Sequence, residues 1–167
     1  MKQYDLYIFD VDGTIAERDT TELLPGVVDW FANNQTAVAF ATNQGGVGLR
    51  HWMIEGNFGD PSKYPDEMDV KVRMRKLRKK LGVRASNVFI SFAYQSKTSG
   101  KWNPVVQAAD EEWSQEWRKP SPGMLQAAMR RNGTENAVMV GDSEDDEAAA
   151  RAAGIDFIHA DDFFGRN

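Results

Sequence analysis

The chain has 167 residues, of which 41% are hydrophobic and 27% charged; this composition indicates a folded globular domain and excludes wholesale disorder. The sequence has no cysteine, which excludes disulfides, cysteine-ligated zinc and thiol catalysis. A net charge of −5 argues against unspecific nucleic-acid binding. No apolar run is long enough to span a bilayer and no signal peptide is evident, so we expect one cytoplasmic domain over residues 1–167.

Short apolar runs alternate with amphipathic segments along the chain. A helix with Pro25 near its start is expected over residues 24–33, and an irregular loop over residues 51–65. The basic stretch 71–84 fits a helix whose apolar face holds Met74, Leu77 and Leu81. The segments expected to form strands are residues 4–9, 36–41, 87–93, 137–140 and 155–158.

The second half of the chain adds further helical patterns. An insertion at about residues 94–118 is expected to contain a helix that begins at Asn103 and Pro104. Ser121 and Pro122 are expected to start a helix that ends at Gly133, and another helix spans about residues 144–153. This alternation predicts an α/β fold with a Rossmann-like, doubly wound parallel sheet. The apolar face of the helix in the insertion is expected to hold Val106, Ala109, Trp113 and Trp117.

Two aspartates follow the first expected strand directly. In an open parallel sheet, reactive groups gather at the carboxyl ends of the strands. Asp10 and Asp12 lie two positions apart at such an end and can both reach one site, and Gly13 permits the chain to turn there. An Asp-Gly pair also marks plain turns, so this string alone leaves an ordinary turn open.

More polar groups fall at the ends of later strands. Thr42, Asn43 and the glycines after them offer a hydroxyl and backbone N–H groups that suit phosphate oxygens. Arg118 and Lys119 place positive charge before a helix N-terminus, which itself favours anions. The acids within residues 142–146 follow the fourth strand and suit Mg²⁺. Taken singly, each group also fits an ordinary loop, surface or helix start.

In this order, the four groups resemble the motifs of the haloacid dehalogenase (HAD) superfamily, whose phosphohydrolases use an aspartate nucleophile. Residues 10–14 resemble its first motif, Thr42 its second, Lys119 its third and residues 141–146 its fourth. Within the superfamily, residues 42–44 and 118–124 are similar to subfamily III, the branch of the histidinol-phosphate and heptose-bisphosphate phosphatases and the polynucleotide 3′-phosphatases. The resemblance implies a HAD-like fold and a phosphatase activity.

The resemblance also implies catalytic roles. Asp10 would be the nucleophile that forms an aspartyl-phosphate, and Asp12 would act first as general acid and then as general base. Thr42, Asn43 and Lys119 would bind the oxygens of the transferred phosphoryl group, where charge must be stabilised.

Mg²⁺ is the cofactor that the resemblance implies. Its ligands would be the side chains of Asp10 and Asp142 and the backbone carbonyl of Asp12. Asp146 would support metal-bound water or the motif lysine, and it fits the spacing of the family's second acid better than Asp145 does. Several members of this branch carry a zinc clip before the motif lysine, but residues 94–118 contain neither cysteine nor histidine, so we expect no zinc.

The spacing of the motifs leaves no room for a large cap domain. Only 32 positions separate Asp10 from Thr42, and the 77 positions from Thr42 to Lys119 hold loops rather than a second domain. We therefore expect a capless enzyme with an open site. The expected substrate is a small phosphorylated metabolite such as a sugar phosphate, contacted by Arg118, and the alternative substrate is the 3′-phosphate of a nucleic-acid end.

Two other features bear on the substrate. Trp102, Trp113 and Trp117 form either a small core for the insertion or a wall that stacks on a base or sugar. The eight basic residues within 71–84 form either a solvated helix face or a track for a phosphate backbone.

Two different classes of protein compete with the phosphatase. A receiver-type signalling domain also uses acids, Thr and Lys around an aspartyl-phosphate, but its acceptor follows a middle strand, whereas Asp10 follows the first. A catalytically inactive HAD scaffold used for binding is the other class, although every required residue type is present. We expect a monomer with no membrane contact.

Overall fold

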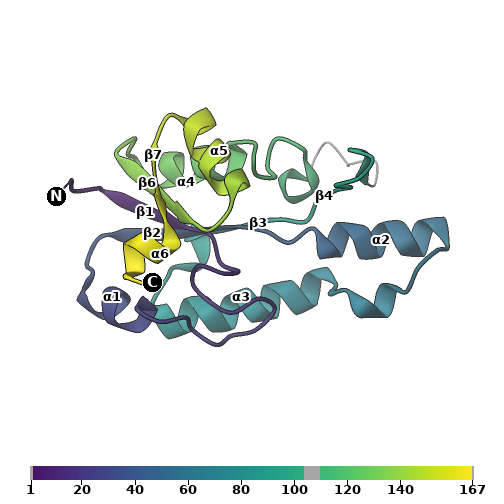
Figure 1. Cartoon of the computed structure of the whole chain (residues 1–167), viewed down its shortest axis with the longest axis horizontal. Helices are drawn as coiled ribbons and strands as arrows, with labels where there is room; N and C mark the ends of the chain where they lie inside the picture. Colours follow the sequence, from purple (N-terminus) through teal and green to yellow (C-terminus); the bar gives the residue numbers. More distant parts are fainter. Residues whose placement is uncertain (1, 104–109, 167) are drawn as a thin grey trace.

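The computed structural model describes residues 2–103 and 110–166 and shows five parallel strands in one sheet (Figure 1). The strands lie in the order β3-β2-β1-β6-β7, and each neighbouring pair is parallel. All five segments expected as strands form strands, so the predicted parallel α/β fold is confirmed. The strand bounds are β1 (Leu6–Phe9), β2 (Ala37–Asn43), β3 (Val88–Ser91), β6 (Ala137–Gly141) and β7 (Asp156–His159).

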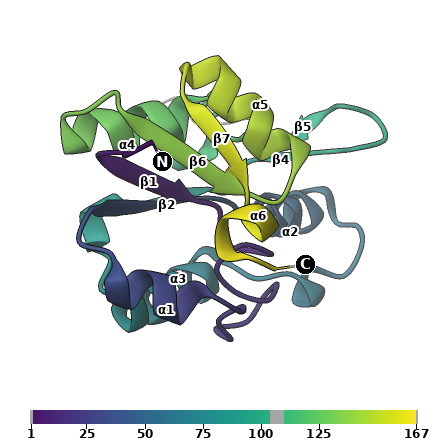
Figure 2. The ribbon, with the colours of Figure 1, turned by 60° about the vertical axis from the view of Figure 1, so that its left-hand side comes forward.

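Helices cover both faces of this sheet, with α1 and α3 on one face and α4 and α5 on the other (Figure 2). Strand β1 contributes to both layers because successive side chains of a strand point to opposite faces. Phe9 belongs to the core with α1 and α3, whereas Leu6 and Ile8 belong to the core with α4 and α5. The helix bounds are α1 (Val27–Asn33), α3 (Glu67–Leu81), α4 (Gly123–Asn132) and α5 (Glu144–Ala153).

The C-terminal helix α6 (Ala160–Phe164) completes the core on the α1 side. The rings of Phe163 and Phe164 lie 5.6 Å and 5.8 Å from the ring of Phe9, measured between centroids. Trp30 of α1 lies 5.2 Å from Phe9, so these aromatic side chains pack around the central strand. Within the described residues, no helix combines the length and apolar character that a membrane crossing requires.

The first helix starts later than expected. We predicted a helix from residue 24 with Pro25 near its start, whereas α1 begins at Val27. Gly26 precedes it with a φ of 86°, a left-handed conformation that stops the helix from extending toward the N-terminus. Leu24 instead donates its backbone N–H to the carbonyl of Ile15, so the loop after β1 holds this segment.

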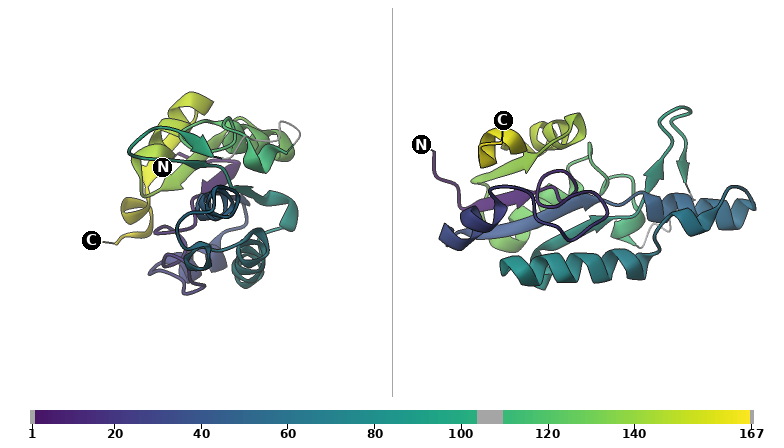
Figure 3. Two further views of the ribbon diagram at one scale, coloured as in Figure 1. Left: turned by 90° about the vertical axis from the view of Figure 1, so that its right-hand side faces the viewer. Right: turned by 60° about the horizontal axis from the view of Figure 1, so that its bottom comes forward.

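The expectation of an irregular loop over residues 51–65 is wrong. Helix α2 (Gly46–Gly56) covers the first part, and a 3-10 turn follows at Pro61–Lys63. The glycines and prolines that suggested a loop lie at and beyond the end of the helix, where Asn57 caps it with a φ of 52°. Helix α2 projects past the sheet, beside the hairpin of β4 (Tyr94–Gln95) and β5 (Trp102–Asn103) (Figure 3).

The helix expected in the insertion is also corrected. Asn103 lies in β5 (Trp102–Asn103), which pairs antiparallel with β4 (Tyr94–Gln95). After residue 109 the structure has only a 3-10 turn, Glu111–Trp113, before the chain reaches α4. This turn is fixed to the sheet because Phe92 donates its backbone N–H to the carbonyl of Glu112. The expected helix positions Pro104, Val106 and Ala109 lie outside the described residues.

Helix termini follow local capping. Helix α3 begins at Glu67, earlier than expected, because Asp66 and Asp69 form a capping box there. Helix α5 spans the predicted residues 144–153 and begins with a capping box of Ser143 and Asp146.

Ser121 does not cap α4 as predicted. The helix begins at Gly123 with Pro122 at the N-cap position, and no side chain caps it. Ser121 instead donates its backbone N–H to the carbonyl of Arg118, which closes a turn ahead of the helix.

Candidate active site

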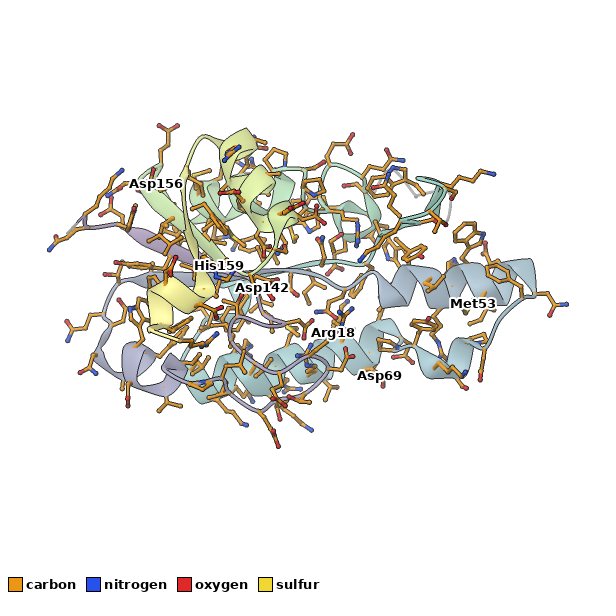
Figure 4. The ribbon with its side chains drawn as sticks, in the orientation of Figure 1. Arg18, Met53, Asp69, Asp142, Asp156 and His159 are labelled. Atoms are coloured by element: carbon orange, nitrogen blue, oxygen red, sulfur yellow. The ribbon has the colours of Figure 1, made fainter. Side chains whose placement is uncertain are left out.

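The expected site residues meet at the carboxyl ends of three adjacent strands. Asp10 follows β1, Asn43 ends β2, and Asp142 follows β6. The backbone N–H of Asp10 donates to the carbonyl of Val140 at 3.0 Å, which extends the pairing of β1 with β6 to the edge of the site. Figure 4 shows Asp142 and, on the loop after β1, Arg18 near these strand ends.

A buried lysine joins two of the carboxylates. The Nζ atom of Lys119 lies 3.0 Å from Oδ1 of Asp10 and 2.6 Å from Oδ1 of Asp146, and it also donates to the carbonyl of Ala41 at 2.7 Å. Lys119 is 2% exposed and Asp146 is 1% exposed. Burial lowers the pKa of Lys119, but the two carboxylates outweigh it and raise this pKa to about 12. Lys119 is therefore a fixed positive charge beside Asp10.

Burial dominates the titration of Asp10. Loss of water raises the pKa of this carboxyl well above its ordinary range, and although Lys119 opposes the shift, the carboxylates of Asp146 and Asp142 add to it. A second positive charge at this position would favour the ionised form that a nucleophile needs.

Asp146 is fully engaged by the protein. Its Oδ2 accepts hydrogen bonds from the backbone N–H groups of Asp142 and Ser143 and from the hydroxyl of Ser143, at 2.9–3.2 Å. Its Oδ1 faces Lys119. Asp146 thus orients the lysine and the loop after β6, while its neighbour Asp145 is exposed.

The carboxylates of Asp10 and Asp142 lie close enough to share a cation, with the engaged carboxylate of Asp146 beside them. Oxygens of Asp10, Asp142 and Asp146 fall within 4.8 Å of one another. The described residues provide no hydrogen-bond donor for the carboxylate of Asp142, and this donor set of hard oxygens fits Mg²⁺. Gly13 makes room for the Asp142 carboxylate, because a Cβ atom at position 13 would collide with Oδ2 of Asp142.

Asp12 is held from two sides. Its Oδ1 accepts from Nη2 of Arg73 at 2.6 Å and from the backbone N–H of Asp19 at 3.2 Å. Its Oδ2 accepts from Nε2 of Gln44 at 2.9 Å. Since both oxygens are engaged, only the backbone carbonyl of Asp12 is left to serve as a metal ligand.

The two polar residues at the end of β2 have different surroundings. Thr42 is fully buried, and its hydroxyl accepts from Nε2 of Gln44 at 2.8 Å. Asn43 donates to the carbonyl of Lys119 at 2.8 Å and accepts from its backbone N–H at 3.0 Å. The Asn43 amide therefore fixes the backbone that carries the lysine.

Arg118 extends from the site toward the insertion. Its Nη1 donates to the carbonyl of Ala93 at 2.9 Å. Burial lowers the pKa of this guanidinium, and the nearby Asp145 opposes the shift. Within the described residues, the carbonyl of Ala93 pairs with one nitrogen of the guanidinium, so Arg118 retains donors for an anion.

A cleft of about 620 Å³ opens over these groups. Among the described tryptophans, none lines it: Trp113 donates to Glu67 at 3.0 Å and packs against Phe92, and Trp117 is buried. The packing of Trp113 and Trp117 therefore fits the interpretation as a small core, and not as a wall that stacks on a substrate. Besides the acids, the lining includes Arg18, Lys63, Lys97, Arg118 and Lys119.

Sequence reasoning did not find Gln44 and Arg73. The sequence feature that could have identified Gln44 is its position next to the second motif, two residues after Thr42. Arg73 belongs to a run of basic residues in which nothing distinguished the one that turns inward from those exposed to solvent.

Comparisons with known proteins place the fold. Residues 116–160, which contain Lys119, Asp142 and Asp146, match the family model described as HAD-hydrolase-like. No curated protein sequence matches the chain. The structure is similar to D,D-heptose 1,7-bisphosphate phosphatase from B. bronchiseptica in complex with magnesium and phosphate, with a TM-score of 0.60, 22% identity, and coverage of 92% of this chain and 78% of that chain.

A second solved structure is similar over most of both chains. It is a protein from Lactobacillus plantarum described as a phosphoglycolate phosphatase, with a TM-score of 0.52, 17% identity, and coverage of 96% of this chain and 87% of that chain. These likenesses show that the chain has a HAD-like α/β fold.

Proposed function

We propose that this protein is a Mg²⁺-dependent phosphatase that hydrolyses a phosphomonoester through an aspartyl-phosphate on Asp10. The observation that carries the proposal is the cluster at the strand ends, where buried Asp10 faces the fixed charge of Lys119 and lies close to the exposed carboxylate of Asp142. A receiver-type acceptor is disfavoured because Asp12 stands beside the nucleophile and supplies the proton transfers that turnover requires.

The reaction proceeds in two displacements. An oxygen of Asp10 attacks phosphorus, the bond to the leaving oxygen breaks, and Asp12 gives that oxygen a proton. Water then attacks the phosphorus of the aspartyl-phosphate while Asp12 takes a proton from it, and the carboxylate of Asp10 leaves. The proton that Asp12 gives to the leaving oxygen in the first displacement is thus returned to it by the water in the second.

The remaining residues bind and stabilise charge. Lys119 and Thr42 are assigned to the phosphoryl oxygens, and Asn43 keeps Lys119 in place. Mg²⁺ would be held by the carboxylates of Asp10 and Asp142 and the carbonyl of Asp12, and when bound it supplies the positive charge that screens the nucleophile from an anionic substrate.

The substrate that we favour is a small phosphorylated metabolite, such as a sugar phosphate. The cleft volume of about 620 Å³ lies in the range of small-molecule sites. Arg18, Lys63 and Lys97 add cationic side chains around the reaction centre, which suits a compact anionic substrate.

A second candidate is the 3′-phosphate of a nucleic-acid end. It is favoured by the exposed basic side chains of α3, which include Arg75, Lys76, Lys79 and Lys80. Lys76 also lines a groove that shares Lys63 with the active-site cleft. This candidate predicts that activity on an oligonucleotide falls steeply with added salt, whereas activity on a sugar phosphate does not.

The test is phosphate release from sugar phosphates, sugar bisphosphates, nucleotides and a 3′-phosphorylated oligonucleotide, measured with Mg²⁺ and with EDTA. We expect Mg²⁺-dependent release by the wild-type protein and by Asp29→Asn, a control at an exposed acid of α1, and none by Asp10→Asn. Activity that survives in Asp10→Asn would contradict the proposed nucleophile. Failure of the wild-type protein on the whole panel would favour a binding scaffold.

A further inference from the structure

Arg73 reaches the active site from outside the strand ends. It lies in the middle of α3, yet its Nη2 atom is 2.6 Å from Oδ1 of Asp12. The Arg73 side chain is only 13% exposed and the Asp12 side chain 22% exposed. This ion pair is therefore shielded from solvent far more than the surface pairs that contribute little to stability.

The Arg73 guanidinium also holds the loop after β1. Its Nε donates to the carbonyl of Thr20 at 2.7 Å, and its Nη2 donates to the carbonyl of Glu17 at 3.2 Å. In the sequence, Asp19 lies between Glu17 and Thr20. Its backbone N–H donates at 3.2 Å to Oδ1 of Asp12, the oxygen that also accepts from Arg73. One side chain thus joins α3, the loop and the Asp12 carboxylate.

These contacts differ from those of a surface arginine. The Nη1 atom of Arg73 is buried and has no hydrogen-bond partner in the described part of the chain, which is a cost that an exposed side chain avoids. The planar guanidinium can reach two carbonyls and a carboxylate at once, whereas a lysine offers a single point charge. Gln44 restrains the other oxygen of Asp12, so the carboxylate has one fixed orientation.

We propose that Arg73 is a positioning residue, which holds the Asp12 carboxylate in the orientation for proton transfer to the leaving oxygen. The inference rests on the proposed function, in which Asp12 is the general acid. A proton donor must sit within hydrogen-bond reach of the atom that it serves, so loss of orientation lowers the rate of the step that uses the proton. The rates of steps that do not need this proton should stay unchanged.

The test compares leaving groups. The quantity kcat/KM covers the steps up to loss of the leaving group, and 4-nitrophenolate leaves without a proton whereas an alkoxide does not. For Arg73→Ala we expect kcat/KM on β-glycerol phosphate to fall by about 10- to 100-fold, a partial loss of general acid catalysis, and kcat/KM on 4-nitrophenyl phosphate to change by less than about threefold. The control Arg131→Ala removes the same charge from an exposed position on α4, away from the site, and should change neither.

A second measurement does not depend on turnover. Hydrogen exchange of the Asp19 amide, which donates to Asp12, should be faster in Arg73→Ala than in wild-type protein and unchanged in Arg131→Ala. Equal losses on the two substrates, or unchanged exchange at Asp19, would overturn the proposal. If the wild-type protein hydrolyses neither substrate, the proposed function fails, and the exchange result alone decides whether Arg73 positions Asp12.

Discussion

The side-chain amide of Asn43 and the backbone of Lys119 exchange two hydrogen bonds, at 2.8 Å and 3.0 Å, although the residues are 76 positions apart. This pairing joins the end of β2 to the segment before α4. It fixes the position of the backbone from which the Lys119 side chain reaches Asp10. Asn43, which was expected to bind phosphate, therefore also positions Lys119.

Asn43→Ala should therefore lower activity as well as stability. We expect the free energy of unfolding to fall by about 1–2 kcal/mol, because two partly buried hydrogen bonds are lost. The matched control is Asn34→Ala, since Asn34 makes the same two-way pattern with the backbone of Thr36 at a distant turn. Urea unfolding should show a loss in both variants, but the phosphatase rate should fall only for Asn43→Ala. Equal rates in the two variants would contradict this role.

Gly13→Ala should disrupt cation binding. Gly13 has a φ of +81°, and a Cβ atom there would meet the Asp142 carboxylate. Gly82, at the end of α3, has a φ of +72° with no atom in the way, so Gly82→Ala imposes similar backbone strain without the collision. Both variants should lose about 1–2 kcal/mol of stability. Calorimetric titration with Mg²⁺ should show weaker binding only in Gly13→Ala, and an equal affinity in both variants would count against the Asp142 site.

Asp10→Asn should stabilise the metal-free protein at neutral pH. Burial raises the pKa of Asp10, so between about pH 4 and the raised value the folded state binds more protons than the unfolded state, and stability falls as pH rises. The amide carries no such charge. We expect a melting temperature about 2–4 °C above wild type near pH 7.5 in EDTA, which corresponds to about 1 kcal/mol, with the difference vanishing near pH 4. A lower melting temperature for the variant at neutral pH would refute this account.

Lys119→Met should be the most destabilising change at the site. It leaves the buried carboxylates of Asp10 and Asp146 without their cation, and breaking a buried ion pair costs about 3–5 kcal/mol. In Lys119→Met/Asp146→Asn one of these charges is also removed, so the double variant should recover part of the loss. Urea denaturation in EDTA measures the free energy of unfolding of both variants. A double variant less stable than Lys119→Met would show that charge burial is not the cause of the destabilisation.

The sheet was largely predictable because its strands are continuous apolar runs, which are characteristic of strands buried on both faces. Helix α5 was predicted with its exact bounds because Ser143 and Gly154 mark its ends in the sequence. Helix α2 was missed because three of its residues are glycines, and Gly48 is one of them for a tertiary reason. A Cβ atom there would collide with the backbone of Phe92, a contact that the sequence does not display.

The candidate site was predictable to the extent that it depends on strand ends. Asp10 and Asp142 come together because β1 and β6 are neighbours in a parallel sheet, and Asn43 at the end of β2 holds the backbone of Lys119 beside them. The partners of Asp12 were not predictable, because they depend on how α3 is rotated about its axis. Exposed Arg75 and partly buried Arg73 are two positions apart in the same basic run, and only packing distinguishes them.

The position of β1 has a consequence for how the protein is made. Leu6 pairs with Ala37 on one side and with Ala137 on the other, so β1 leaves the ribosome well before β6, the strand that completes its ladder. Until β6 emerges, one edge of β1 stays open, and Asp10 lacks Asp142 and Asp146, which follow that strand. A nascent chain, or one cut before β6, therefore lacks the candidate site, which is assembled only when this strand joins β1.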